Sequence, residues 1–161
     1  MTQRLLALGT LMAIATIGAH AQKTYTSASS FLADAKLSYS DDFTSVADGA
    51  FAGTYTAAGG SGLGFSVAAT DGLWSVGGGN ISTSSAGDSM TVNFTGGVNM
   101  VGGSFWAADM DGVATPGTVT LTFSDGGSYT SASSDFFGYS NANAWLTSMT
   151  LSLDSEYIDG N

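Results

Sequence analysis

The feature that most constrains the fold is the alternation of apolar residues with Thr and Ser along the second half of the chain. Apolar side chains occupy every second position in several stretches, and small polar side chains fill the positions between them. Successive side chains of a strand point to opposite faces, so this period predicts antiparallel strands with one buried face and one hydroxyl-rich face. The apolar positions are Met90, Val92 and Phe94, then Val119, Leu121 and Phe123, and then Trp145, Met149, Leu151 and Leu153.

Weaker strand patterns fill most of the remaining chain. Gly, Ser, Asn and Asp separate them, which is typical of turns between strands. These segments predict an all-β fold, an antiparallel β-sandwich or jelly roll of about eight to ten strands. The weaker strands are expected at residues 51–56, 63–68, 73–76, 98–107, 128–131, 136–139 and 157–159.

One short helix is expected ahead of the strands. Ser29 or Ser30 is a suitable N-cap, and residues 31–37 would form the helix. Asp34 would then lie in the first turn, where a carboxylate interacts favourably with the helix dipole. The predicted domain therefore begins with a short N-terminal helix and continues with strands.

The first 21 residues have the three parts of a secretory signal peptide. Arg4 supplies the positive charge, residues 5–18 the apolar stretch, and an Ala-His-Ala sequence the cleavage site. A membrane anchor is the alternative, but the apolar stretch is shorter than the roughly 20 residues that a spanning helix needs. We therefore expect residues 1–21 to be removed. Residues 22–161 would form a single domain without a membrane span, secreted to the periplasm, the cell envelope or the extracellular space.

Charged residues are few and unbalanced. The chain has 3 Lys and Arg against 13 Asp and Glu, a net charge of -10, which argues against nucleic acid or an anionic membrane as partner. After the signal segment only Lys23 and Lys36 are basic, and no Arg, His or Cys occurs. This composition excludes Ser-His and Cys-His hydrolases, His/Cys zinc sites and phosphoryl transfer with Lys and Arg clamps. Two carboxylates would suffice for a glycosidase, but no Arg or His is available to tune them, so we predict a non-catalytic protein.

Several short motifs follow one another in a particular order. They are SFLA at 30–33, DDF at 41–43, GGSFWAAD at 102–109, LTFSDG at 121–126, FFGYS at 136–140 and YID at 157–159. In this order they resemble the exported β-sandwich ectodomains of bacterial PEP-CTERM proteins, over nearly the whole domain. The resemblance implies a bacterial host, export as a substrate of an exosortase sorting system, and a link to biofilm and extracellular polysaccharide. The Pro-Glu-Pro motif, apolar span and Arg cluster of the sorting tail are missing, so we expect a truncated chain or a freely secreted relative.

Four carboxylates are candidates for a Ca²⁺ site: Asp42, Asp109, Asp111 and Asp159. Asp109 and Asp111 are separated by one residue, and a Gly follows Asp111, which gives an oxygen-rich loop that suits Ca²⁺. In similar jelly-roll domains an acidic residue on the first strand and one on the last often share a structural Ca²⁺, and Asp42 and Asp159 hold those places. No cation in the body of the domain is available to offset clustered carboxylates. The alternative is that they are turn and surface residues satisfied by water or by backbone N–H groups.

Aromatic rings flanked by Asn, Asp and Ser predict a surface that binds polysaccharide. A ring stacks on the apolar face of a sugar, and amide groups bind the sugar hydroxyls. The candidate ligand-binding residues are Trp74, Tyr139, Asn141 and Trp145. The alternative places the rings in the core, and for Trp106 and Trp145 the apolar strand pattern favours that alternative.

These patterns together predict a secreted, non-catalytic module that binds extracellular polysaccharide or another cell-surface component, with Ca²⁺ as the candidate cofactor. The alternative is a structural subunit of an extracellular matrix or filament. Such a subunit would self-associate through edge strands that are low in charge, such as residues 118–123.

Overall fold

The computed structural model describes residues 22–51, 53–59, 62–75, 79–132 and 134–160. Strands make up most of this part of the chain, and one short helix, α2 (Ala28–Asp34), lies near its start. The strands are β1 (Gln22–Tyr25), β2 (Gly49–Phe51), β3 (Tyr55–Ala58), β4 (Gly64–Ala69), β5 (Leu73–Ser75), β6 (Ile81–Thr83), β7 (Met90–Val98), β8 (Met100–Ala108), β9 (Val119–Phe123), β10 (Ser128–Ser131), β11 (Phe136–Asn141), β12 (Leu146–Ser152) and β13 (Tyr157–Gly160).

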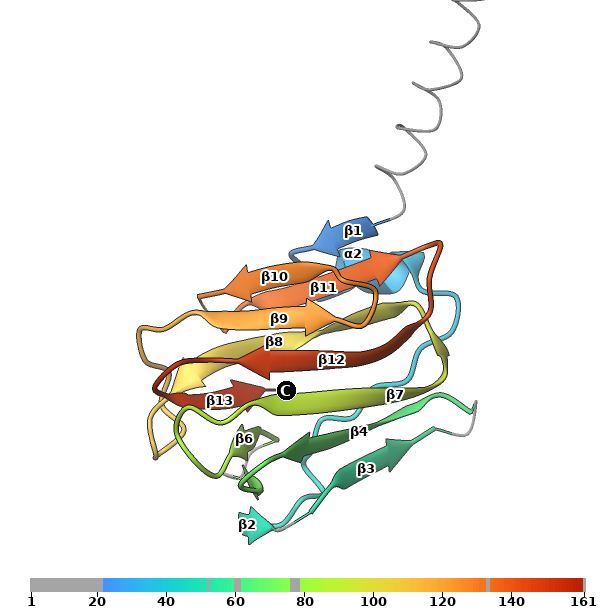
Figure 1. The fold of residues 1–161 in the computed structure, drawn as a ribbon. Coiled ribbons are helices and arrows are strands. Elements are labelled where there is room, and N and C mark those ends of the chain that lie inside the picture. Colours follow the sequence, from blue (N-terminus) through green and yellow to red (C-terminus); the bar gives the residue numbers. More distant parts are fainter. Residues whose placement is uncertain (1–21, 52, 60–61, 76–78, 133, 161) are drawn as a thin grey trace, which may run out of the picture.

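The strands form two sheets that pack face to face (Figure 1). The seven-stranded sheet has the order β1-β11-β8-β13-β6-β5-β2, and the six-stranded sheet has the order β10-β9-β12-β7-β4-β3. Each pair of neighbouring strands is antiparallel. The predicted all-β antiparallel sandwich with one short N-terminal helix is therefore confirmed.

The alternation of side chains explains the burial of the central strands. In β9, Val119, Leu121 and Phe123 are buried, whereas the two threonines between them are not. The same period buries Met149 and Leu151 in β12, which pairs with β9. The Thr side chains of both strands lie on the opposite face, as the sequence predicts.

The core lies between the two sheets. The seven-stranded sheet contributes Leu73, Ile81 and Ile158, and the six-stranded sheet contributes residues such as Leu121 and Leu151. Each of these side chains is at most 1% exposed, and the burial of one such side chain contributes about 1.5–3 kcal/mol relative to an exposed one. Aromatic rings also stack across the core, with the Phe123 and Tyr139 centroids 4.2 Å apart and those of Tyr129 and Phe137 3.7 Å apart.

The helix begins earlier than predicted. Its N-cap is Ser27 rather than Ser29 or Ser30, and the Ser27 hydroxyl accepts a hydrogen bond from the Ser30 N–H. The chain leaves β1 at Tyr25, so the first serine that follows caps the helix. Asp34 is consequently the last helical residue, and its predicted place in the first turn is wrong. Within the described residues no helix is long and apolar enough to cross a bilayer.

The strand predictions missed several short elements near the sheet margins. β1 and β6 are not predicted, because each contains a single apolar residue and so shows no alternation of apolar with polar side chains. The single strand predicted at residues 51–56 is wrong, since this stretch divides between β2 and β3, which belong to different sheets. Gly53 lies between them with a φ of 122°, a conformation that Gly adopts readily and other residues do not. The described residues therefore contain more strands than the predicted number.

Candidate functional site

Trp145 lies just before β12 and is 67% exposed. The interpretation of Trp145 as a core residue is therefore wrong, and the reason is a local irregularity. Leu146 and Met149 are both buried although they are three residues apart, so the alternation breaks between them. The pairing with β7 shifts register at the same place, where Gly96 and Gly97 have φ values of 88° and 73°. At this irregularity Leu146, and not Trp145, lies on the buried face.

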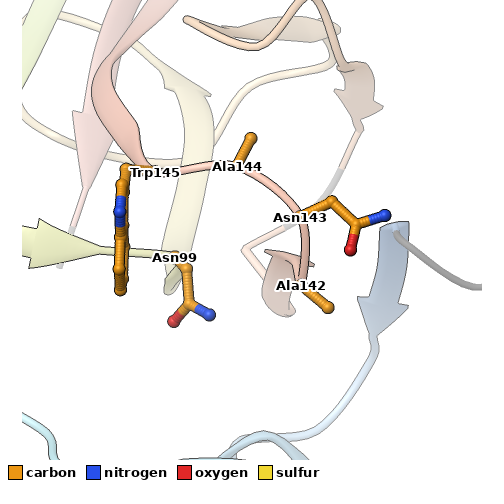
Figure 2. Close-up of a pocket in the computed structure, with 5 residues that line it drawn as sticks. All are labelled: Asn99, Ala142, Asn143, Ala144 and Trp145. Atoms are coloured by element: carbon orange, nitrogen blue, oxygen red, sulfur yellow. The ribbon is translucent and has the colours of Figure 1, made fainter.

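Trp145 forms one wall of a hollow at the end of the sandwich (Figure 2). Asn99, between β7 and β8, lies beside the indole, and residues 142–144 between β11 and β12 form the opposite wall. The hollow encloses about 170 Å³ and is lined by Asn99, Ala142, Asn143, Ala144 and Trp145, none of which is charged. We refer to these five residues as the Trp145 hollow. Figure 2 shows the Asn99 amide beside the indole, whereas the Asn143 side chain extends from the loop away from Trp145.

The indole of Trp145 is supported by the glycine turn of β7. A Cβ atom placed on Gly97 would lie 3.8 Å from the Cε3 and Cζ3 atoms of the ring, which is ordinary van der Waals contact. The backbone of Gly97 therefore lies close to the ring and limits its movement. Much of the remaining ring surface is open to solvent, as the exposed fraction of Trp145 requires.

Tyr139 and Asn141 were predicted to contact a ligand, but both side chains are buried, with exposed fractions of 4% and 7%. Both lie on β11, and both donate to one carboxylate oxygen of Asp125. The Tyr139 hydroxyl and the Asn141 Nδ2 each lie 2.7 Å from Asp125 Oδ2. The prediction that they present their side chains to a ligand is therefore corrected: they lie beneath the hollow, in a hydrogen-bonded network.

Hydrogen bonds connect this network to both walls of the Trp145 hollow. The Asn143 N–H donates to Asn141 Oδ1 at 3.0 Å, and the Asn141 N–H donates to the Asn99 carbonyl oxygen at 3.0 Å. Asn141 thus links residues 142–144 to the β7–β8 connection.

Asp125 is ionised at neutral pH in this network. Burial raises the pKa of Asp125, but hydrogen bonds from Asn141, from the Gly127 N–H and from Tyr139 lower it, and the pKa ends below its ordinary value. Burial, followed by the hydrogen bond to the Asp125 carboxylate, raises the pKa of Tyr139 well above its ordinary value. The pair is therefore a neutral phenol that donates to a charged carboxylate, which is a strong type of hydrogen bond.

Trp74 is also exposed, at 42%, but lies elsewhere. It belongs to β5, where it pairs with Ala50 and Ser82. β5 and β11 are four strand positions apart in the seven-stranded sheet, or about 19 Å at the usual strand spacing. The structure does not bring Trp74 to the Trp145 hollow. Trp106 on β8 is 9% exposed, which agrees with the alternative interpretation of that residue as buried.

The Asp109 and Asp111 pair closes a turn. Asp109 Oδ1 accepts hydrogen bonds from the N–H groups of Asp111 and Val113, at 2.9 and 3.0 Å. This carboxylate therefore satisfies backbone donors of its own loop, which is the alternative role expected for an Asp before a Gly turn.

Asp42 and Asp159 lie in different environments. Asp42 is exposed, and its Oδ1 accepts from the N–H and hydroxyl of Thr44, which lower its pKa. Asp159 on β13 is fully buried, and neither carboxyl oxygen has a hydrogen-bond partner. The described residues contain no group of three or more acidic, His or Cys residues that could hold a metal ion. The Ca²⁺ site stays a prediction, which melting temperatures measured in Ca²⁺ and in EDTA would test.

The stretch of residues 118–123, predicted to be an edge for self-association, lies inside its sheet. β9 occupies most of this stretch and pairs with β10 on one side and with β12 on the other. Among the described strands, the sheet edges are β1 and β2 in one sheet and β10 and β3 in the other.

Neither Asn99 nor Asp125 is among the binding residues that the sequence predicts, although Asp125 lies in the LTFSDG motif at 121–126. Asn99 is a single Asn between two strand patterns, and Asp125 lies in a Ser-Asp-Gly-Gly stretch that is typical of any hairpin turn. Only the tertiary structure brings them to Asn141, because β8 pairs with β11 in one sheet whereas β9 lies in the facing sheet.

Comparisons with protein-family models, with curated proteins and with solved structures found no match to this chain. The resemblance to PEP-CTERM ectodomains therefore stays a prediction. The geometry of the Trp145 hollow is the basis for a functional proposal.

Proposed function

We propose that this chain is a secreted, non-catalytic module that binds a neutral extracellular polysaccharide in the Trp145 hollow. One observation carries the proposal: a largely exposed indole, supported by a glycine turn, lies beside the Asn99 amide at an uncharged hollow. An aromatic face stacks on the apolar C–H face of a sugar ring, and amide groups both donate to and accept from sugar hydroxyls. Secretion is supported by the signal segment at residues 1–21.

The charge of the protein favours a neutral ligand over an acidic one. No charged residue lines the hollow, and no Lys or Arg follows Lys36 in the sequence. A net charge of -10 repels a polymer rich in carboxylate or sulfate groups. The proposed ligand class is therefore polysaccharide built from uncharged sugars.

Affinity electrophoresis and titration calorimetry with a soluble neutral glucan, a neutral mannan and a polyuronate test this proposal. We expect binding to a neutral polymer and none to the polyuronate. Trp145→Ala should weaken binding at least about tenfold, because exposed aromatic anchors dominate such contacts. Trp74→Ala is the matched control, since it removes an exposed Trp outside the hollow. It should change the affinity by less than about twofold.

Two results would contradict the proposal. One is the absence of binding to every neutral polymer by the folded wild-type chain. The other is an equal loss of affinity in Trp74→Ala and Trp145→Ala, since a specific hollow requires the two variants to differ.

A further inference from the structure

We propose that Asp125 is a positioning residue for the Trp145 hollow: it sets the orientation of the Asn141 amide and thereby holds the wall formed by residues 142–144. This inference rests on the proposed function, since it concerns the shape of the same binding site. Asp125 itself lies outside the lining of the hollow. Its role is carried by four hydrogen bonds.

The first step is the chemistry of the Asp125 carboxylate, which accepts hydrogen bonds and donates none. Its Oδ1 accepts from the Gly127 N–H at 2.9 Å, and its Oδ2 accepts from the Tyr139 hydroxyl and from Asn141 Nδ2. Only the NH₂ end of the Asn141 amide satisfies this acceptor. Asp125 therefore selects one of the two orientations of that amide.

The second step follows from the opposite end of the amide. With Nδ2 facing Asp125, Asn141 Oδ1 faces the loop and accepts from the Asn143 N–H. The reverse orientation would place NH₂ against the Asn143 N–H and oxygen against the carboxylate, so that both hydrogen bonds would be lost. The loop that carries Asn143 and leads to Trp145 is thus held only while Asp125 is an acceptor.

The third step is the connection to the core. Tyr139 stacks on Phe123 with an interplanar angle of 8°, which fixes the direction of its hydroxyl towards Asp125. Asn141 is buried, and a buried polar group that loses its partner is costly. The network therefore transmits the rigidity of the sandwich to the rim of the hollow, and the Asn141 N–H extends it to Asn99.

Asp125→Asn is the test, because it keeps the size of the side chain and replaces one acceptor oxygen with a donor. If the amide oxygen of the substituted side chain still accepts from the Gly127 N–H, the NH₂ group of that side chain faces Asn141 Nδ2. Two hydrogen-bond donors then face each other. If the Asn141 amide turns, the Asn143 N–H loses its acceptor; if the amide keeps its orientation, it loses its partner at position 125 and holds the Asn143 N–H less firmly. We expect amide hydrogen exchange at Asn143, measured by NMR without ligand, to become about tenfold faster. The affinity for the neutral polysaccharide should become about fivefold weaker.

Three further variants separate positioning from general destabilisation. The double variant Asp125→Asn/Asn141→Asp reverses the pair at constant charge. Its new amide donates to the new carboxylate, whose second oxygen accepts from the Asn143 N–H, so wild-type exchange and affinity should return. Tyr139→Phe removes a different hydrogen bond of Asp125 but leaves the carboxylate as the acceptor for the Asn141 amide, so it should speed exchange at Asn143 less than Asp125→Asn does. Asp154→Asn removes an exposed carboxylate and controls for charge.

The outcomes are distinct. Faster exchange at Asn143 in Asp125→Asn, reversed in the double variant, supports the positioning role. Wild-type exchange at Asn143 in Asp125→Asn overturns the positioning role. It does so even if Trp145→Ala abolishes binding, a result that would leave the proposed function standing. The expected exchange pattern without any polysaccharide binding supports the positioning role and overturns the proposed function. If Asp125→Asn does not fold, the double variant decides alone: wild-type exchange supports the proposal and faster exchange overturns it.

Discussion

Asp159 is the residue whose environment departs most from that of an ordinary carboxyl group. It is fully buried on β13, opposite Ser82 of β6 and Trp106 of β8. Burial raises its pKa to about 6, and the nearby Ser82 hydroxyl, which does not reach hydrogen-bond geometry with the carboxyl group, lowers the pKa only in part. The folded chain therefore binds the Asp159 proton more tightly than the unfolded chain, in which the pKa is about 4.

This difference predicts how Asp159 affects stability against pH. Its contribution is most favourable below about pH 4, decreases as the pH rises to about 6, and is constant above that value. Asp159→Asn removes this titration, so the variant should be about 3 kcal/mol more stable than wild type at neutral pH and similar to it near pH 4. Urea unfolding at the two pH values measures the difference, with Asp154→Asn as the control. A less stable Asp159→Asn at neutral pH would contradict the prediction and would indicate a cation bound to the ionised carboxylate.

At the scale of elements, α2 is attached to the outer face of the seven-stranded sheet by close approach to a glycine. Phe31 packs edge-on to Tyr25 of β1 and next to Phe136 of β11. A Cβ atom on Gly138 would lie 2.7 Å from Cδ2 of Phe31, closer than such contacts allow. Gly138 therefore makes room for the ring that holds the helix.

Gly138→Ala should destabilise the domain by about 1–3 kcal/mol, because the added methyl group displaces Phe31 from β11. Calorimetric melting measures the loss. The double variant Gly138→Ala/Phe31→Leu is the control, since a smaller side chain at position 31 relieves the overlap and should recover part of the stability. No recovery would show that the cost of the methyl group arises from something other than the contact with α2.

At the scale of the whole molecule, charge repulsion is nearly unopposed. The chain has 13 acidic and 3 basic residues, and the ion pair found among the described residues joins Lys23 to Asp34 near the N-terminal end. Both partners are largely exposed, and pairs of this kind contribute little to stability. Screening by salt should therefore stabilise the fold rather than weaken it.

We expect the melting temperature to rise by about 2–5 °C as NaCl increases from about 0.02 to about 0.5 M, because salt screens repulsion between like charges. KCl should have the same effect, which separates screening from binding of a particular cation. A melting temperature that falls with salt would mean that attractive charge pairs dominate the stability.

The fold class followed from local physics. The alternation of Val119, Leu121 and Phe123 with threonines specifies a strand with one buried face wherever its partners lie, and such strands bury their apolar faces only against one another. Strand predictions failed where the elements were short or interrupted by a glycine turn, as between β2 and β3. In those places local residues do not determine which sheet a segment joins.

The sequence by itself determined an acidic, all-β chain without imidazole or thiol chemistry after residue 21, because composition and a period of two are properties of the chain alone. Only the tertiary structure decided which polar and aromatic residues meet. Trp145 is exposed at the place where the register between β12 and β7 shifts, and Tyr139 and Asn141 are buried where they bond to Asp125 of another hairpin. Register and cross-sheet contacts depend on residues far apart in the chain, so the pattern of adjacent residues along the sequence does not predict them.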